Sequence, residues 1–234
     1  MLGIAVGGAL GAASALMTYA VRSPSSSILA PSVYRGPRSR RALGLTFDDG
    51  PGERTLEMLE LLDRYRARAT FFQCGVNIER HPDVARAVAK AGHEIGNHSF
   101  THPRFHFRSS RFIEDELTRA QSAILNITGV SPALFRAPYG IRWMGMRAAQ
   151  RRLNLLGVMW TVIGHDWRLP AGAIVERVLK GTGNGAIICL HDGREIQAKP
   201  DIGPTVEAVR RLMPVLRDQG FTFETVSQLI CPRN

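Results

Sequence analysis

The sequence predicts an α/β fold in which parallel strands alternate with helices that cover them. Two observations favour this class. Short apolar runs that suit buried strands alternate with stretches whose apolar residues recur at helical spacing. The residues with the most distinctive chemistry follow the apolar runs, and (β/α) barrels carry their active sites at the carboxyl ends of their strands. The pattern is therefore compatible with a closed barrel.

The elements follow one another along most of the chain. Strands are expected over residues 42–47, 69–72, 94–97, 134–136, 155–163, 185–191 and 221–223. Helices are expected over residues 53–65, 82–91, 111–125, 142–153, 174–180 and 205–219. This regular succession of strand and helix favours one parallel sheet over an antiparallel one.

Composition narrows the class further. Hydrophobic residues make up 44% and charged residues 21% of the 234 positions, which is typical of a folded domain and excludes a disordered chain. No repeat of solenoid or propeller length is present. Cys74, Cys189 and Cys231 are too few and too scattered for a disulfide framework or a cysteine-based zinc site.

The chain is strongly basic. Its 30 basic and 20 acidic residues give a formal net charge of +10, and 27 of the basic residues are Arg. Such a surface favours anionic partners, for example an acidic cell-wall polymer or membrane headgroups. The alternative is a compositional bias spread over a solvated surface. Basic and aromatic residues are not interleaved as in single-strand binders, so nucleic acid is not an expected partner.

Three segments are expected along the chain. Residues 1–22 form an apolar segment, uncharged from residue 1 to 21, whose length suits a membrane anchor or a signal-like segment. A soluble, buried or frayed segment is the alternative. The basic residues follow this segment instead of preceding it, and by the positive-inside rule they argue against export. Residues 23–41 have the Ser, Pro and Arg content of a linker, and the globular domain is expected over residues 42–230.

Two clusters at predicted strand ends suit metal chemistry. Asp48 and Asp49 end the first strand, and adjacent carboxylates at a strand end face different directions, so one can bind metal while the other handles a proton. His98 and His102 follow the third strand, and Pro103 disfavours helix at His102. One Asp with two His supplies three ligands with open positions for water, the pattern of a catalytic zinc site.

Three later strand ends add groups for proton transfer. Arg136, in the sequence Arg-Ala-Pro-Tyr-Gly, can pair with a carboxylate and hold it ionised. Asp166 lies in Gly-His-Asp-Trp, and His191 ends the strand Ile-Ile-Cys-Leu-His. A His placed near an Asp is a candidate general acid. Strand alternation puts Cys189 on the same face as His191, where we expect it to act as a small apolar side chain.

Taken together and in this order, the motifs TFDDGP, HSxxH, RxPY and LHD resemble those of the polysaccharide deacetylase family, the NodB homology domain of carbohydrate esterase family four. Each motif is weak alone, but the set is highly specific. The resemblance covers residues 42–230 and implies a distorted (β/α) barrel. It implies removal of N-acetyl groups from a GlcNAc-containing polymer or oligomer, such as peptidoglycan or a chitin-like oligosaccharide, in the cell envelope.

The resemblance also implies residue roles. Asp49, His98 and His102 would bind one divalent metal ion, usually zinc, with cobalt as an alternative. Asp48 would be the general base, held by Arg136, and His191 the general acid, tuned by Asp166. The backbone N–H of Tyr139 would stabilise the oxyanion. The acetyl pocket would be formed by the side chains of Trp167, Leu190 and Cys189.

Two departures from the family pattern leave the preferred acyl group or sugar open. Ile163 stands where the fourth motif usually has Asp, and Cys189 where the fifth usually has Leu. An O-acetyl esterase acting on xylan would use the same site, and a non-catalytic carbohydrate-binding relative would keep the fold. A phosphatase of the DxDGT type is disfavoured because no residue separates Asp48 from Asp49.

Overall fold

The computed structural model describes residues 2–231, with side chains described from residue 11 onward. The strands are β1 (Ser32–Val33), β2 (Ala42–Asp48), β3 (Thr70–Gln73), β4 (Glu94–Asn97), β5 (Leu134–Phe135), β6 (Leu156–Val158), β7 (Val162–Ile163), β8 (Ile187–His191) and β9 (Thr222–Glu224). The helices are α1 (Leu2–Arg22), α2 (Thr55–Arg64), α3 (Gly75–Arg80), α4 (Pro82–Lys90), α5 (Ser110–Thr128), α6 (Met146–Leu153), α7 (Ala171–Gly181), α8 (Gly203–Asp218) and α9 (Val226–Ile230).

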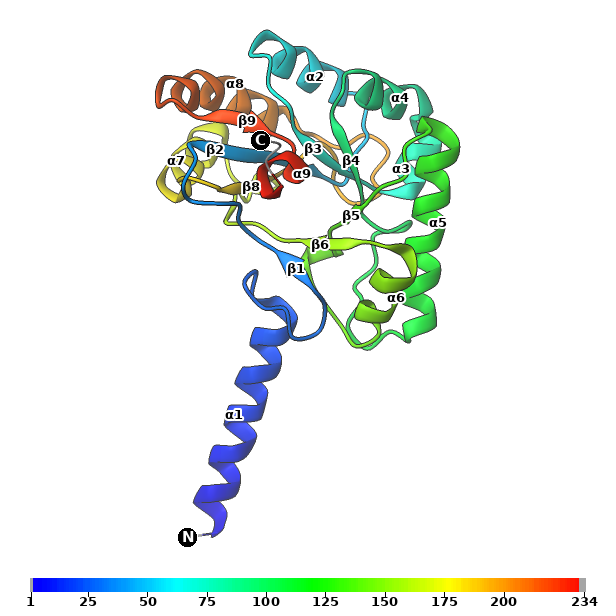
Figure 1. Ribbon diagram of the computed structural model, residues 1–234, viewed down its shortest axis with the longest axis vertical. Coiled ribbons are helices and arrows are strands. Elements are labelled where there is room, and N and C mark those ends of the chain that lie inside the picture. The colour runs from blue at the N-terminus through cyan, green and yellow to red at the C-terminus, as the bar shows by residue number, and fades with distance from the viewer. Residues whose placement is uncertain (1, 232–234) are drawn as a thin grey trace.

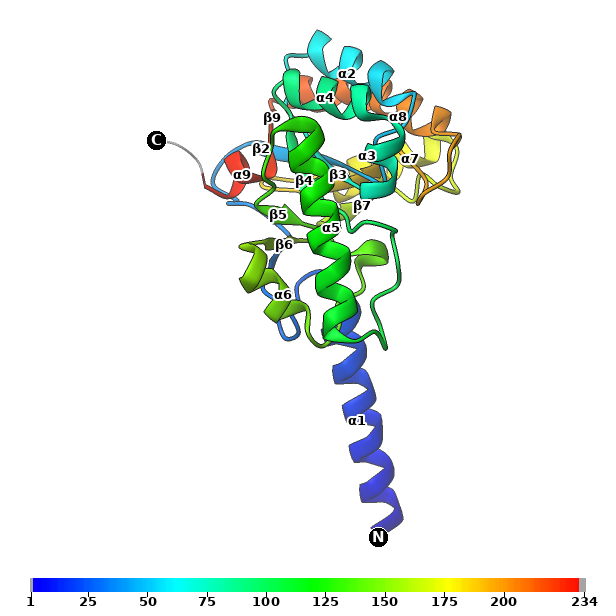
Figure 2. The ribbon, with the colours of Figure 1, turned by 90° about the vertical axis from the view of Figure 1, so that its right-hand side faces the viewer.

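The strands form one curved sheet surrounded by helices (Figure 1). Their order is β1-β6-β5-β4-β3-β2-β8-β7, β9 pairs with β2, and the strands of each pair run parallel. Helices α2, α4, α5, α7 and α8 lie around the outside of the strands in both views (Figures 1 and 2). The distorted (β/α) barrel expected from the sequence is confirmed.

Strand β2 is covered on both of its faces. All seven of its residues are buried, as expected for a parallel strand between two layers. Leu45 and Phe47 point into the large core formed with the surrounding helices. Thr46 and Asp48 therefore point to the inside of the barrel, since side chains alternate along a strand. This alternation places both polar side chains of β2, Thr46 and Asp48, on the same face of the strand.

A second apolar cluster fills the inside of the barrel. Phe72, Leu134 and Ile187 contribute to it from three strands, and Val226 and Leu229 contribute from α9. Helix α9 begins with a capping box at Thr225, whose side chain accepts from the backbone N–H of Gln228. This apolar cluster does not include the polar residues, which lie at the carboxyl ends of the strands.

The sequence pattern predicts one strand over residues 155–163, but the structure divides this stretch into β6 and β7. Strand β6 pairs with β1 and β5, whereas β7 pairs with β8 at the other end of the sheet. The chain crosses the open side of the barrel between them, and Thr161 secures the crossing: its backbone N–H donates to Ile187 O at 2.9 Å and its hydroxyl to Tyr34 O at 2.7 Å. The apolar run is continuous because Val158 and Met159 before the crossing and Val162 after it are buried.

Residues 23–41, which the sequence predicts to be a linker, instead pack against the domain and add a strand to its sheet. Its strand β1 pairs with β6, and Ala30 is buried against the cluster that includes Phe135. The buried guanidinium of Arg142 donates to the carbonyl oxygens of Ser23 and Ser26. The backbone carbonyl groups of this stretch thus serve as acceptors for side chains of the domain.

Helix α1 projects away from the barrel (Figure 1). Its last turn contacts the domain, where Ala20 is buried and Val21 O accepts from the backbone N–H of Arg142. Among the residues whose side chains the structure describes, no helix is long and apolar enough to cross a membrane. The membrane segment expected over residues 1–21 lies partly outside those residues, since the side chains of residues 1–10 are not described.

Candidate active site

Three predicted metal ligands converge on one point above the sheet. Asp49 directly follows β2, and His98 directly follows β4. His102 lies in a loop, as Pro103 predicts, with a left-handed φ of 55°. The Oδ1 atom of Asp49 lies 3.2 Å from Nε2 of His98 and 3.1 Å from Nε2 of His102, and all three side chains are buried. The structure therefore places three ligand atoms within reach of one ion.

Hydrogen bonds to the outer atoms of His98 and Asp49 leave His98 Nε2 and Asp49 Oδ1 available to bind a cation. His98 Nδ1 lies 2.8 Å from the carbonyl oxygen of Arg136, which fixes the ring with Nε2 facing inward. Asp49 Oδ2 accepts from the backbone N–H of Glu195 at 2.8 Å, while Oδ1 is buried without a hydrogen-bond partner. A buried carboxylate oxygen normally has a partner. An ion bound by Asp49, His98 and His102 would supply the missing one, so the donor set fits a divalent metal.

Charge in the cluster favours ionised Asp49. Burial opposes ionisation of this carboxyl group, but the neighbouring His102 and His98 outweigh burial and hold its pKa well below the usual range. An anionic carboxylate with two imidazoles is the form that binds a divalent ion.

Asp48 faces the inside of the barrel beside this cluster. Its Oδ1 accepts from Nη1 of Arg136 at 2.6 Å, and the same guanidinium donates to the Thr46 hydroxyl at 2.7 Å. Arg136 is fully buried and also donates to the carbonyl oxygens of Val158 and Met159. Arg136 is thus fixed by four acceptors, and it holds one oxygen of Asp48 while leaving the other facing the site.

His191 and Asp166 form a second fixed pair. Asp166 Oδ1 lies 2.8 Å from Nδ1 of His191, and Oδ2 accepts from the backbone N–H of His191 and the hydroxyl of Thr205. Burial lowers the pKa of the imidazole, but the buried carboxylate of Asp166 more than offsets this and raises it to about 9. His191 is therefore protonated at neutral pH.

The loop that carries Tyr139 lies next to His102. Tyr139 has a left-handed φ of 57°, and its ring centroid lies 4.6 Å from that of His102. Its hydroxyl donates to Glu195 Oε1 at 2.7 Å. On the other side of the site, the half-exposed Trp167 packs edge-on against His191 with centroids 5.2 Å apart. The two exposed aromatic rings border the site.

Strand β8 directs Cys189 and Leu190 to opposite faces of the sheet, so the two side chains cannot both line the expected acetyl pocket. Cys189 faces the site, with Sγ 3.5 Å from Asp48 Oδ2. Leu190 is fully buried in the core cluster under the helices, with its side chain close to Gly164. It lies on the opposite face from Cys189 and His191, because neighbouring residues of a strand alternate. Placing Leu190 in the wall of the acetyl pocket is therefore wrong.

Several polar residues near the site were missed by the sequence reasoning. Glu195 links Asp49 to Tyr139, and Asn77 donates to the carbonyl oxygens of Asp49 and Glu195 at 2.6 and 2.7 Å. Asp192 is buried and accepts from the Thr55 hydroxyl at 2.7 Å; burial, followed by the charge of Asp49, raises its pKa to about 7. Asp192 was visible in the motif LHD, but nothing in the sequence signalled Asn77 or Glu195.

A parallel (β/α) barrel with a buried Asp–His–His cluster at the carboxyl ends of its strands defines a class of protein equipped to bind a divalent cation beside an acid–base pair. Comparison with known proteins narrows this class to one family. A profile described as polysaccharide deacetylase matches residues 35–158, more than half of the chain. The chain belongs to the polysaccharide deacetylase family, as its motifs suggested.

Individual relatives agree with this assignment. The chain is 36% identical over 220 residues to a chitooligosaccharide deacetylase of Sinorhizobium fredii, covering 91% of this chain and 98% of that protein. It is 30% identical to the peptidoglycan-N-acetylglucosamine deacetylase PgdA of Listeria monocytogenes, with 87% of this chain covered, but it spans only 42% of that protein. The structure of the Bc1960 peptidoglycan N-acetylglucosamine deacetylase superposes with a TM-score of 0.78 at 28% identity, covering 84% of this chain and 91% of that one.

Proposed function

We propose that this chain is a metal-dependent hydrolase that removes N-acetyl groups from a GlcNAc-containing polymer or oligomer of the cell envelope. The observation that carries the proposal is the Asp49–His98–His102 cluster with Asp48 and His191 beside it. Amide hydrolysis needs an activated water, a base and an acid, and these groups can serve all three needs. The named activities of the relatives, on peptidoglycan and chitooligosaccharide, support the substrate class.

The cation is proposed to be zinc, with cobalt able to replace it. Asp49, His98 and His102 would hold it through one oxygen and two nitrogen atoms, the ligand types of catalytic zinc sites. A bound divalent ion lowers the pKa of a water ligand and polarises a carbonyl oxygen.

Asp48 is proposed as the general base. Its contact with Arg136 holds the carboxylate in place and directs it from β2 toward the Asp49 cluster, where Oδ2 lies 4.0 Å from Nε2 of His98. The side chain therefore faces the position from which a water would attack. Arg136 acts on the reaction only by positioning Asp48.

His191 is proposed as the general acid. Asp166 holds Nδ1, so Nε2 faces the site with a proton to donate. The raised pKa keeps that proton bound at neutral pH until the amine leaves. Asp166 is thus a positioning and tuning residue, comparable to the buried Asp partner of the histidine in other hydrolases.

The remaining proposed roles concern the acetyl group. The backbone N–H of Tyr139 is proposed to donate to the oxyanion, as a preorganised backbone dipole can do without reorganisation. Trp167 and Cys189 are proposed to line the acetyl pocket. The small thiol of Cys189 would occupy the side of this pocket next to Asp48.

The decisive experiment measures acetate release by the full chain on N-acetylglucosamine oligomers, peptidoglycan and acetylated xylan, with added zinc or with a chelator. The expected result is zinc-dependent release from one of the two GlcNAc substrates, lost on chelation and restored by zinc. Release from acetylated xylan alone would replace the N-deacetylase by an O-acetyl esterase. No release from any substrate by the folded, metal-loaded protein would favour a carbohydrate-binding relative without catalysis.

A further inference from the structure

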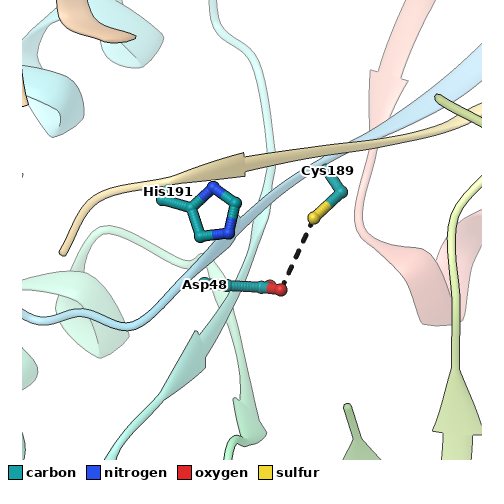
Figure 3. A group of neighbouring side chains, drawn as sticks. All are labelled: Asp48, Cys189 and His191. Atoms are coloured by element: carbon teal, nitrogen blue, oxygen red, sulfur yellow. Dashed lines mark hydrogen bonds between the residues drawn. The ribbon is translucent and has the colours of Figure 1, made fainter. Parts of the chain in front are cut away.

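Asp48, Cys189 and His191 form a second group of potential ligands that shares no residue with the Asp49 cluster. They come from two adjacent strands whose register aligns Thr46 with Cys189 and Asp48 with His191. A carboxylate oxygen, the thiol sulfur and an imidazole nitrogen all lie within 4.8 Å of one another. Figure 3 shows the imidazole and the thiol on the same side of the Asp48 carboxylate.

The separation of two of these atoms fits a tetrahedral ion. Zinc binds thiolate sulfur at about 2.3 Å and carboxylate oxygen at about 2.0–2.2 Å, so a tetrahedral site separates the two atoms by about 3.6 Å. Cys189 Sγ and Asp48 Oδ2 are 3.5 Å apart. In the protein without the ion, the same distance lets the thiol donate weakly to the carboxylate.

The surrounding contacts leave the required atoms available. Arg136 occupies Oδ1 of Asp48 and leaves Oδ2 toward Cys189. Asp166 occupies Nδ1 of His191 and leaves Nε2, which is the arrangement that orients metal-binding histidines in proteins. A set of one thiolate, one imidazole and one carboxylate favours zinc or cobalt over magnesium or calcium.

The two groups should bind with different affinities. His98 Nε2 and Asp48 Oδ2 are only 4.0 Å apart, so two ions in these positions would repel each other. The second ion would also have to displace protons from Cys189 and His191 and accept the nearby charge of Arg136. The Asp49 group should therefore fill first.

We propose that Asp48, Cys189 and His191 form a second, weaker site for zinc-like cations, whose occupancy blocks the enzyme. The blocking step rests on the proposed function. An ion on Oδ2 of Asp48 and Nε2 of His191 occupies the atoms that would accept and donate protons. Excess zinc then inhibits the activity, whereas excess magnesium does not.

The test is a titration of the metal-free full chain with cobalt(II), with bound metal measured by equilibrium dialysis. The wild type is expected to bind two equivalents, and a thiolate-to-cobalt charge-transfer band should appear with the second. Cys189→Leu and Cys189→Ser should each bind one equivalent and lack the band. Retained binding of the first equivalent and an unchanged circular dichroism spectrum show that these variants are folded.

Cys231→Ser is the matched control, because Cys231 is an exposed free thiol that could bind cobalt at the surface. This variant should keep both the second equivalent and the band. A wild type that binds one equivalent without the band at tenfold excess of cobalt overturns the proposal, as does a band that persists in Cys189→Leu.

The inhibitory part has its own readout. In the wild type, excess zinc should lower the rate at least tenfold relative to the rate at one equivalent of zinc. In Cys189→Leu, the same excess should lower the rate less than twofold. If the wild type binds a second equivalent but excess zinc does not lower its rate, the proposed inhibition is overturned, whereas the second metal site itself is supported. If no variant shows any activity, the proposed function fails, and the spectroscopic titration still decides whether the site exists.

Discussion

The adjacent carboxylates of Asp48 and Asp49 are chemically identical but have different neighbours. Asp49 faces two imidazoles, while Asp48 faces a buried guanidinium. Strand alternation and the turn after β2 account for this, because Asp48 ends the strand and Asp49 has a left-handed φ of 71°. The backbone therefore gives the two carboxylates the different surroundings that their proposed roles, metal ligand for Asp49 and base for Asp48, require.

This division predicts different losses for two substitutions. Asp48→Asn should lower turnover by at least about 100-fold while zinc remains bound, since only the base is removed. His98→Ala should lose both turnover and the metal ion of the Asp49 cluster. Acetate release and metal content by atomic absorption measure the two effects. Unchanged activity in Asp48→Asn would contradict the assignment of the base.

The Asp166–His191 pair predicts a pH dependence. In the folded protein the His191 pKa is about 9, above the value of about 6.5 for a free imidazole, so the pair stabilises the fold fully below pH 6.5 and this stabilisation is lost as the pH rises through 9. Activity that needs protonated His191 should likewise fall on the alkaline side. Asp166→Asn removes the carboxylate, so the alkaline limb of kcat/KM should move at least one pH unit lower.

The control for this profile is Asp201→Asn, because Asp201 is an exposed carboxylate. Its alkaline limb should coincide with that of the wild type. If Asp166→Asn also leaves the limb unchanged, the group that titrates is not His191.

The residues that sequence could reveal are those that stand at strand ends. Asp48, Asp49, His98, His102 and His191 follow apolar runs, and parallel strands bring their carboxyl ends together. Glu195 could not be predicted, since it lies in the long connection before α8 and reaches Asp49 only through the path of that loop. Leu190 belongs to the same motif as His191 but lies on the other face of β8, because the side chains of neighbouring strand residues point to opposite faces.

Among the elements, long helices and buried strands were predictable and short ones were not. Helix α5 was expected over residues 111–125 and extends over Ser110–Thr128, bounded by the Ser109 cap and a left-handed Gly129. Strand β1 has two residues, too few for any period to appear. It exists because the edge of β6 offers unpaired backbone groups, which is a property of the assembled sheet.

The role of β1 predicts a difference between two truncations. Deleting residues 1–41 removes β1 and the carbonyl acceptors of the buried Arg142, which should cost at least about 2 kcal/mol in the free energy of unfolding. Deleting residues 1–18 keeps β1 and Ala20 and should change stability by less than about 0.5 kcal/mol. Urea denaturation measures both. Equal stability of the two truncations would show that residues 19–41 are a linker after all.

At the scale of the whole molecule, the 30 basic residues outnumber the 20 acidic ones, so ion pairs within the protein leave the net charge of +10 unchanged. Arg152 pairs with Glu114, and Arg147 donates to backbone oxygens of Ser27 and Ile28, so the basic residues of α6 are largely engaged within the protein. Attraction for anionic polymers should therefore come from the summed field of the surface. No single cluster is expected to dominate it.

Such a field predicts binding to an anionic wall polymer that weakens with salt. Because exposed charges are screened within about 8 Å at physiological ionic strength and about 3 Å at 1 M, the affinity should fall at least tenfold across that range. Arg151→Ala should change it less than twofold, since Arg151 is one exposed charge among many. Sedimentation with the insoluble polymer measures the affinity, and a neutral GlcNAc oligomer serves as control because its binding should not respond to salt. An equal response of the two ligands would show that the charge of the surface does not recruit the polymer.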